Sequence, residues 1–184
     1  ARVLPRLVRE SRVDLPAVLD EGVAVGFFVF GDANGNLGYR WTENTGPVGV
    51  APNPGDVNKF PYFSAQALAI NNGGTIVGQG SPTAAIPFVA TALGPGGTFT
   101  FLPPAELARG VNNAGAVVGK YRGNDQAGFY WAEGTGLEVI SPTPSELFFA
   151  RDVFDVNDAG IVVGWCTGSE CAPDASGYLW SRTG

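Results

Sequence analysis

A short phrase that recurs three times in this chain constrains its fold more than any other feature. The copies NNGGTIVG, NNAGAVVG and NDAGIVVG begin at Asn71, Asn112 and Asn157, and a weaker copy without the asparagine, LDEGVAVG, begins at Leu19. The glycines at the fourth position of the copies are separated by 52, 41 and 45 residues. This spacing is typical of one four-stranded unit in a β-repeat protein. We therefore expect four similar units.

Each copy of the phrase has the residues of a β-hairpin. The asparagine suits the first position of the turn, where its side chain can cap the backbone, and the glycine can supply the positive φ that ends a type I turn with a bulge. The apolar triplet that follows, such as residues 161–163, is too short for a helix and favours a buried strand. The glycine that closes each phrase indicates a bulge or a close approach of two backbones.

Further strands surround each phrase. A strand such as 67–70 precedes the turn, and a strand such as 137–142 follows a later Gly-containing turn. Between them lies an aromatic strand, which reads GYRW at 38–41, IPFV at 86–89, GFYW at 128–131 and GYLW at 177–180. We expect these recurring rings to form core layers rather than a ligand platform. The aromatic clusters at 60–63 and 147–149 are expected to pack inward, with a carbohydrate or protein contact as the alternative.

These strands predict an all-β fold in a single domain of residues 1–184. The expected repeats are four-stranded antiparallel units at 6–59, 60–104, 105–143 and 144–184. The last repeat stops before its Pro-terminated strand, and the segment Ala1, Arg2, Val3, Leu4 and Pro5 has the pattern of that strand. We therefore predict a small four-bladed β-propeller whose N-terminal strand completes the last blade.

The N-terminal strand has two possible docking sites. Docking on its own chain would close the ring, whereas docking on a neighbour would make a dimer or a filament by strand exchange. We favour closure within the chain, because local concentration favours the intramolecular partner.

The only two cysteines, Cys166 and Cys171, lie between two expected strands of the last repeat. We expect a local disulfide that fixes this loop. A four-ligand zinc site is excluded as the explanation, because the chain has only these two cysteines and no histidine.

The charge distribution bears on the expected partners. The net charge is −6, yet the first twelve residues contain four arginines and one glutamate. This arm could steer self-association. Because its arginines alternate with apolar residues on an acidic chain, we expect no nucleic-acid partner. No apolar run has the length of a membrane span, and the absence of methionine is consistent with removal of a signal peptide, so we expect a secreted, extracellular or periplasmic, bacterial protein.

The order of residues in each unit resembles the HAF repeat of probable extracellular bacterial proteins. The shared pattern is Asn-x-x-Gly, a β-branched run, Gly, and an aromatic strand that ends in Trp, and it covers nearly the whole chain in about four copies. The family's His-Ala-Phe strand corresponds here to the segments that begin at Leu37, Ala85, Ala127 and Ser176, none of which contains histidine. The resemblance implies a secreted, β-propeller-like chain.

Little in the sequence points to chemistry. The absence of histidine removes the commonest acid–base and nucleophilic mechanisms. Glu43, Glu133 and Glu138 are candidates for a carboxylate pair of a hydrolase, but no spacing singles out two of them. The segment Asp32–Asn36, with Glu43 at the twelfth position, has oxygen side chains that calcium would accept, and an Asn-Gly hairpin turn is the alternative that we favour. We expect no catalytic residue, cofactor or metal.

The sequence thus favours a secreted structural or interaction module without catalytic activity, for which self-assembly by exchange of residues 1–5 stays open beside closure within the chain. The alternative is a module that binds glycans or small ligands through the rim loops of the propeller, where several weak sites could add up. The expected partner is a second copy of the chain, another extracellular protein or a glycan.

Overall fold

The computed structural model of the chain is an all-β structure. It describes residues 12–19, 22–29, 36–50, 64–81, 87–91, 98–102, 104–121, 127–140, 150–166 and 176–182. These residues form strands and turns and no helix. The part of the chain that the structure describes therefore has no helix with the length and apolarity to cross a membrane.

The strands form four antiparallel sheets that follow one another along the sequence. Each sheet is a meander in which neighbours in sequence pair in space. Sheet 1 contains β1 (Arg12–Val18), β2 (Ala24–Val29), β3 (Asn36–Thr42) and β4 (Gly46–Gly49). Sheet 2 contains β5 (Ser64–Ile70), β6 (Thr75–Ser81), β7 (Pro87–Thr91) and β8 (Thr98–Phe101). Sheet 3 contains β9 (Ala105–Val111), β10 (Val117–Tyr121), β11 (Gly128–Ala132) and β12 (Gly136–Ile140). Sheet 4 contains β13 (Ala150–Val156), β14 (Ile161–Cys166) and β15 (Ser176–Ser181).

The repeated phrase forms the turn between the first two strands of each sheet. In the second sheet, Gly74 donates its N–H to the Asn71 carbonyl at 2.9 Å and has a φ of 80°, and Thr75 donates to Asn71 Oδ1 at 2.9 Å. The same turn in the first sheet lacks the asparagine, yet Gly22 donates to the Leu19 carbonyl at 3.0 Å and has a φ of 74°. The predicted left-handed glycine and the hydrogen bond that closes the turn are present in these sheets, and the turn type stays a prediction.

The glycine that closes each phrase lies at a close approach of two backbones. A Cβ on Gly119 would run into the carbonyl oxygen of Leu107 and lie 2.9 Å from the Ala108 Cα, both on the neighbouring strand β9. The pairing of β9 with β10 shifts register at this point. Gly78 and Gly164 are in the same situation. The register shifts confirm the predicted bulges, and the close backbone approach leaves no room for a side chain at these glycines.

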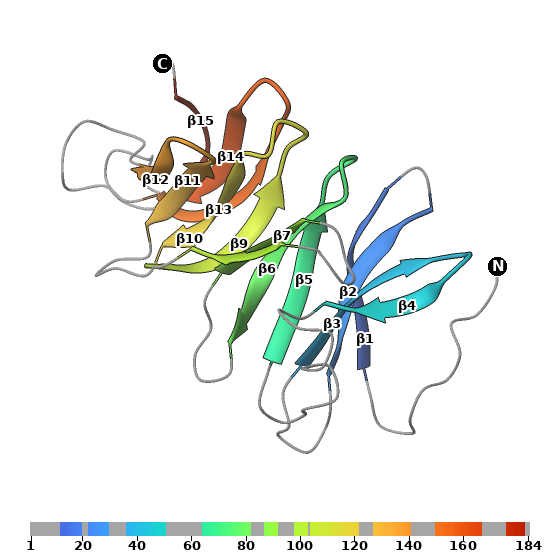
Figure 1. Cartoon of the computed structure of the whole chain (residues 1–184). Helices are drawn as coiled ribbons and strands as arrows, with labels where there is room; N and C mark the ends of the chain where they lie inside the picture. Colours follow the sequence, from blue (N-terminus) through green and yellow to red (C-terminus); the bar gives the residue numbers. More distant parts are fainter. Residues whose placement is uncertain are drawn as a thin grey trace.

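Successive sheets pack face to face and bury three apolar clusters (Figure 1). The first strand of each later sheet, β5, β9 or β13, lies across the first three strands of the preceding sheet. The described residues form an open row of sheets from the N-terminal to the C-terminal repeat, without a closed ring.

The recurring aromatic residues of the third and fourth sheets contribute to the second and third clusters, as predicted for a core layer. Tyr39 and Phe129 are almost fully buried, and Tyr130 lies 5.7 Å from Trp180, centroid to centroid, across the junction of the third and fourth sheets. The alignment of the second copy was wrong by one residue. The structure pairs Ala90, not Val89, with the strand position that faces tryptophan in the other sheets. The Pro87-Phe88 start gave no clear signal of this register.

The fourth sheet has three strands in the described part of the chain, whereas each of the other sheets has four. The proposed completing strand, residues 1–5, lies outside the described residues, as do the aromatic clusters at 60–63 and 147–149. Their predicted roles stay predictions.

Candidate functional site

The first asparagine of each phrase joins its repeat to the next one. Asn71 donates from Nδ2 to the carbonyl oxygen of Asn112 at 2.9 Å, and Asn112 donates from Nδ2 to the carbonyl oxygen of Asn157 at 3.0 Å. The Oδ1 atoms of the same side chains cap their own turns, as in the 2.8 Å bond from the Ala116 N–H to Asn112. Asn71 and Asn112 are buried, with 6% and 5% of their surface exposed. Each buried amide therefore uses both of its ends.

The second residue of each phrase adds a parallel row of bonds. The Asn72 N–H donates to Asn113 Oδ1 at 2.9 Å, and the Asn113 N–H donates to Asp158 Oδ1 at 2.8 Å. Asn113 also donates from Nδ2 to Asp158 Oδ2 at 2.8 Å. Because the backbone bond and then the side-chain bond from Asn113 favour the charged carboxylate, the pKa of Asp158 lies below its ordinary value. We call these six residues, Asn71, Asn72, Asn112, Asn113, Asn157 and Asp158, the asparagine ladder.

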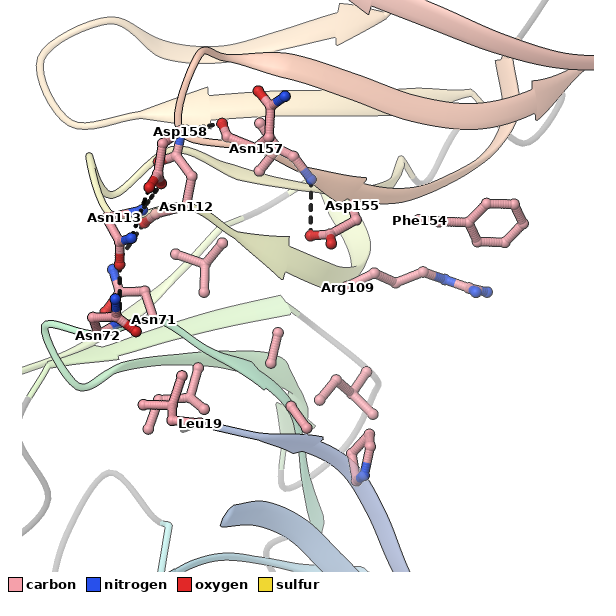
Figure 2. A pocket seen from close by; sticks show the side chains of 17 residues that line it. Leu19, Asn71, Asn72, Arg109, Asn112, Asn113, Phe154, Asp155, Asn157 and Asp158 are labelled. Carbon is pink, nitrogen blue, oxygen red and sulfur yellow. Dashed lines mark hydrogen bonds between the residues drawn. The ribbon is translucent and has the colours of Figure 1, made fainter. Parts of the chain in front are cut away.

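All the ladder bonds between repeats run in one direction, with the donor on the earlier repeat (Figure 2). At the start of the chain, Leu19 occupies the asparagine position and has no side-chain donor. At the other end, Asn157 is exposed, and its Nδ2 has no partner among the described residues. The ladder therefore begins at the second repeat and ends in an unused donor on the fourth.

The ladder forms one wall of a groove of about 520 Å³. The first strand of every sheet, together with the turn that follows it, contributes to the lining, from Pro16 in the first sheet to Phe154 in the fourth. These strands are edge strands in their sheets. The groove is thus the place where all four repeats meet, and it exposes main-chain edges as well as side chains.

Arg109 of the third sheet and Phe154 of the fourth sheet lie beside each other on the lining of the groove (Figure 2). Arg109 Nη2 pairs with Asp152 Oδ2 at 3.2 Å, and its guanidinium lies 5.7 Å from the centre of the Phe154 ring. Behind this pair, burial and then the Asp152 carboxylate raise the pKa of Tyr178. Arg109 Nε, Asp152 Oδ1 and the Tyr178 hydroxyl have no hydrogen-bond partner among the described residues. All three atoms are buried, so they are not open to a ligand in the groove.

Comparisons of this chain with protein-family models, with curated proteins and with solved structures find no match. The resemblance to HAF repeats accordingly stays a prediction.

Most residues that the sequence singled out lie apart from this site. Cys166 is buried at the end of β14, and Cys171 lies outside the described residues, so the disulfide stays a prediction. Of the possible calcium loop, Asp32–Asn36, only Asn36 belongs to the described residues, where it begins β3. Within the described ranges no group of three or more acidic or cysteine side chains is placed to hold a metal.

The three candidate carboxylates are not brought into one site. Glu43 lies exposed in the turn between β3 and β4, whereas Glu133 lies exposed in the turn between β11 and β12. Glu138 lies on β12 and pairs with Arg182 at 3.3 Å, with both side chains about half exposed. This placement gives no support to a particular catalytic pair.

The ladder itself was missed, although a signal for it was present. Capping a turn requires only a side-chain oxygen, which aspartate or serine supplies as well as asparagine. The choice of asparagine in three copies therefore indicates that the Nδ2 donor is also used. The recurrence of an oxygen-bearing side chain at the next position, in Asn72, Asn113 and Asp158, is the second part of that signal.

Proposed function

We propose that this chain is a secreted structural or interaction module without catalytic activity, which acts by binding other protein chains and assembles with copies of itself. The observation that carries the proposal is the fourth sheet, which has three strands in the described residues where each other sheet has four. In the described residues β15 is its last strand, whereas β4, β8 and β12 cover the corresponding strand in the other three sheets. An uncovered sheet edge presents N–H and C=O groups that pair readily with a strand of another chain.

The segment 1–5 is the proposed completing strand. Its apolar residues and its closing proline have the pattern of the fourth strand of the other repeats. Pairing within the chain would complete the last blade of a four-bladed propeller, and the groove lined by all four first strands supports that arrangement. Pairing with a neighbour would give strand exchange. The open row of sheets in the described residues favours the neighbour.

Sedimentation velocity of the intact chain and of the chain without residues 1–5 tests the proposal. We expect concentration-dependent assembly of the intact chain and its loss in the shortened chain. A monomeric intact chain, with a shortened chain that is merely less stable, would instead show closure within one molecule. Assembly that survives the deletion unchanged would contradict strand exchange.

The groove supports a second candidate function, the binding of glycans or small ligands. Phe154 is 45% exposed beside Arg109 on the lining of the groove, and an aromatic face next to a guanidinium donor suits a sugar ring. This site lies along the first strands rather than in the rim loops that the sequence suggested. A glycan array tests it with intact chain and Phe154→Ala. Binding that disappears in the variant favours the candidate, and a blank array for the intact chain contradicts it.

A further inference from the structure

The apolar position that faces the following repeat is covered in three sheets and uncovered in the fourth. Val25, Val77 and Val118 hold the seventh position of the repeated phrase, and each is fully buried in the cluster that its sheet shares with the next one. Val163 holds the same position in the fourth sheet and is 39% exposed. Ile161 on the same strand is 37% exposed, and Leu179, paired with Val163 across β14 and β15, is 74% exposed.

The position that faces the preceding repeat shows the reverse pattern. Ile70, Val111 and Val156 immediately precede the turn in the second, third and fourth sheets, and they are 5–8% exposed because each packs in the cluster shared with the sheet before it. Val18 precedes the turn of the first sheet and is 66% exposed. The two outer faces of the row thus leave uncovered the two positions that meet at every internal junction.

The asparagine ladder has the same polarity. The fourth repeat ends in the unused Nδ2 donor of Asn157. The carbonyl oxygens that accept ladder bonds, those of Asn112 and Asn157, also accept the N–H of their own turn glycine. The Leu19 carbonyl has this arrangement, since it accepts from Gly22 at 3.0 Å. The Leu19 carbonyl oxygen of the first sheet is therefore an acceptor that matches the Nδ2 donor of Asn157.

We propose that the outer face of the fourth sheet binds the outer face of the first sheet of a second copy of this chain. Val163, Ile161 and Leu179 of one copy pack on Val18 of the next, and Asn157 Nδ2 donates to the next copy's Leu19 carbonyl. The new junction repeats the packing and the hydrogen bond that already join the third and fourth sheets. Because the two faces differ, the contact is head to tail and continues from copy to copy. This inference rests on the proposed self-assembly, and it adds to the exchanged strand a second contact, made between sheet faces.

Two single substitutions block the two faces separately. Val163→Lys places a charge on the fourth-sheet face, and Val18→Lys places one on the first-sheet face. Each should weaken self-association at least about tenfold, because a lysine would be buried without a partner. Asn157→Asp keeps the turn cap on the Ile161 N–H and removes only the donor, and it should weaken association by about fivefold. Val139→Lys is the matched control, since Val139 is 43% exposed on β12, on neither outer face.

Mixing the two blocked variants tests the head-to-tail geometry directly. The Val163→Lys chain keeps an intact first-sheet face and the Val18→Lys chain keeps an intact fourth-sheet face, so each alone should be monomeric and an equimolar mixture should form a one-to-one dimer. Sedimentation velocity and light scattering measure these states, and circular dichroism with thermal melts verifies that every variant is folded.

Three results would overturn the inference, and they separate it from the proposed function. Assembly of the intact chain that neither lysine weakens leaves self-assembly in place and removes these faces from it. A folded mixture that stays monomeric contradicts the head-to-tail pairing. An intact chain that is monomeric at all concentrations removes both the inference and the proposed self-assembly.

Discussion

Asn112→Asp tests the asparagine ladder most directly, because it changes one end of the side chain and preserves its shape. The carboxylate can still accept from the Ala116 N–H, as Asn112 Oδ1 does at 2.8 Å. The donor that reaches the Asn157 carbonyl at 3.0 Å becomes an acceptor. The substitution therefore removes the bond between repeats without removing the turn cap.

The expected loss follows from the burial of the site. One hydrogen bond contributes about 1 kcal/mol, and a buried polar group left facing another acceptor costs about 1–3 kcal/mol more. With only 5% of Asn112 exposed, water does not relieve this repulsion. We expect the free energy of unfolding to fall by about 3 kcal/mol at pH 7, which in a chain of this length lowers Tm by roughly 6–12 °C. Protonation of the new carboxyl group at acidic pH restores a donor and should recover part of the loss.

Asn157→Asp is the control, because the chain uses the same turn and the same cap there without a ladder bond from Nδ2 in the described residues. Asn157 is exposed, so the change should stay within about 0.5 kcal/mol. Urea denaturation of both variants, followed by tryptophan fluorescence at a concentration where the chains are monomeric, gives the two values. Equal losses, or no loss in Asn112→Asp, would refute the view that the ladder stabilises the junction between repeats.

Three further predictions concern single side chains. Gly119→Ala should lower the free energy of unfolding by about 2–3 kcal/mol, because the new Cβ meets backbone that cannot move away. The control is Gly177→Ala, whose Cβ would lie 3.8 Å from its nearest neighbour and which should change the free energy of unfolding by less than about 0.5 kcal/mol. Equal effects of the two substitutions in urea denaturation would contradict the close approach at Gly119. Tyr178→Phe should leave the free energy of unfolding unchanged or raise it by up to about 1 kcal/mol, since the buried hydroxyl has no hydrogen-bond partner in the described residues. A clear loss of stability in urea denaturation would show that the hydroxyl makes a hydrogen bond. Asp158→Asn should lower Tm at pH 6, and this loss should become smaller as the pH falls below 3.8. The reason is that the carboxylate, whose pKa is lowered in the fold, stabilises the fold above pH 3.8 and loses this contribution on protonation. A constant Tm difference between variant and parent in thermal melts from pH 6 to pH 3 would contradict the bonds from Asn113.

The features that the sequence predicted well are determined within one repeat. The turn at Asn71 depends on an asparagine cap and on the left-handed Gly74, and both requirements are met within four residues of chain. The bulge at Gly119 likewise follows from a missing side chain between two adjacent strands. Local chemistry of this kind can be read from residue types, and so the meander of each repeat was predicted.

The features that were missed depend on how repeats stack. The bond from Asn71 to Asn112 spans 41 residues and exists only because two turns lie at hydrogen-bonding distance. The register of β7 was misjudged because its sequence has neither the glycine nor the tryptophan of the related strands, and hydrogen bonding to β6 places Ala90 opposite Ile76. The groove required the positions of all four first strands together.

The polarity of the ladder limits the ways in which copies of this chain can associate. A two-fold dimer through the fourth sheets would bring two Asn157 donors together without an acceptor, and one through the first sheets would bring two Leu19 carbonyls together without a donor. Pairing the two fourth-sheet ends therefore leaves the Asn157 donors without an acceptor, and pairing the two first-sheet ends adds no hydrogen bond, whereas pairing unlike ends gives each Asn157 donor an acceptor. Leu19 also explains why the ladder stops at the second repeat, since its side chain packs in the apolar cluster shared by the first two sheets instead of donating a hydrogen bond. The first repeat thus differs from the others at the residue that would extend the ladder, whereas the donor end and the acceptor end of the row follow from the single direction of the ladder bonds.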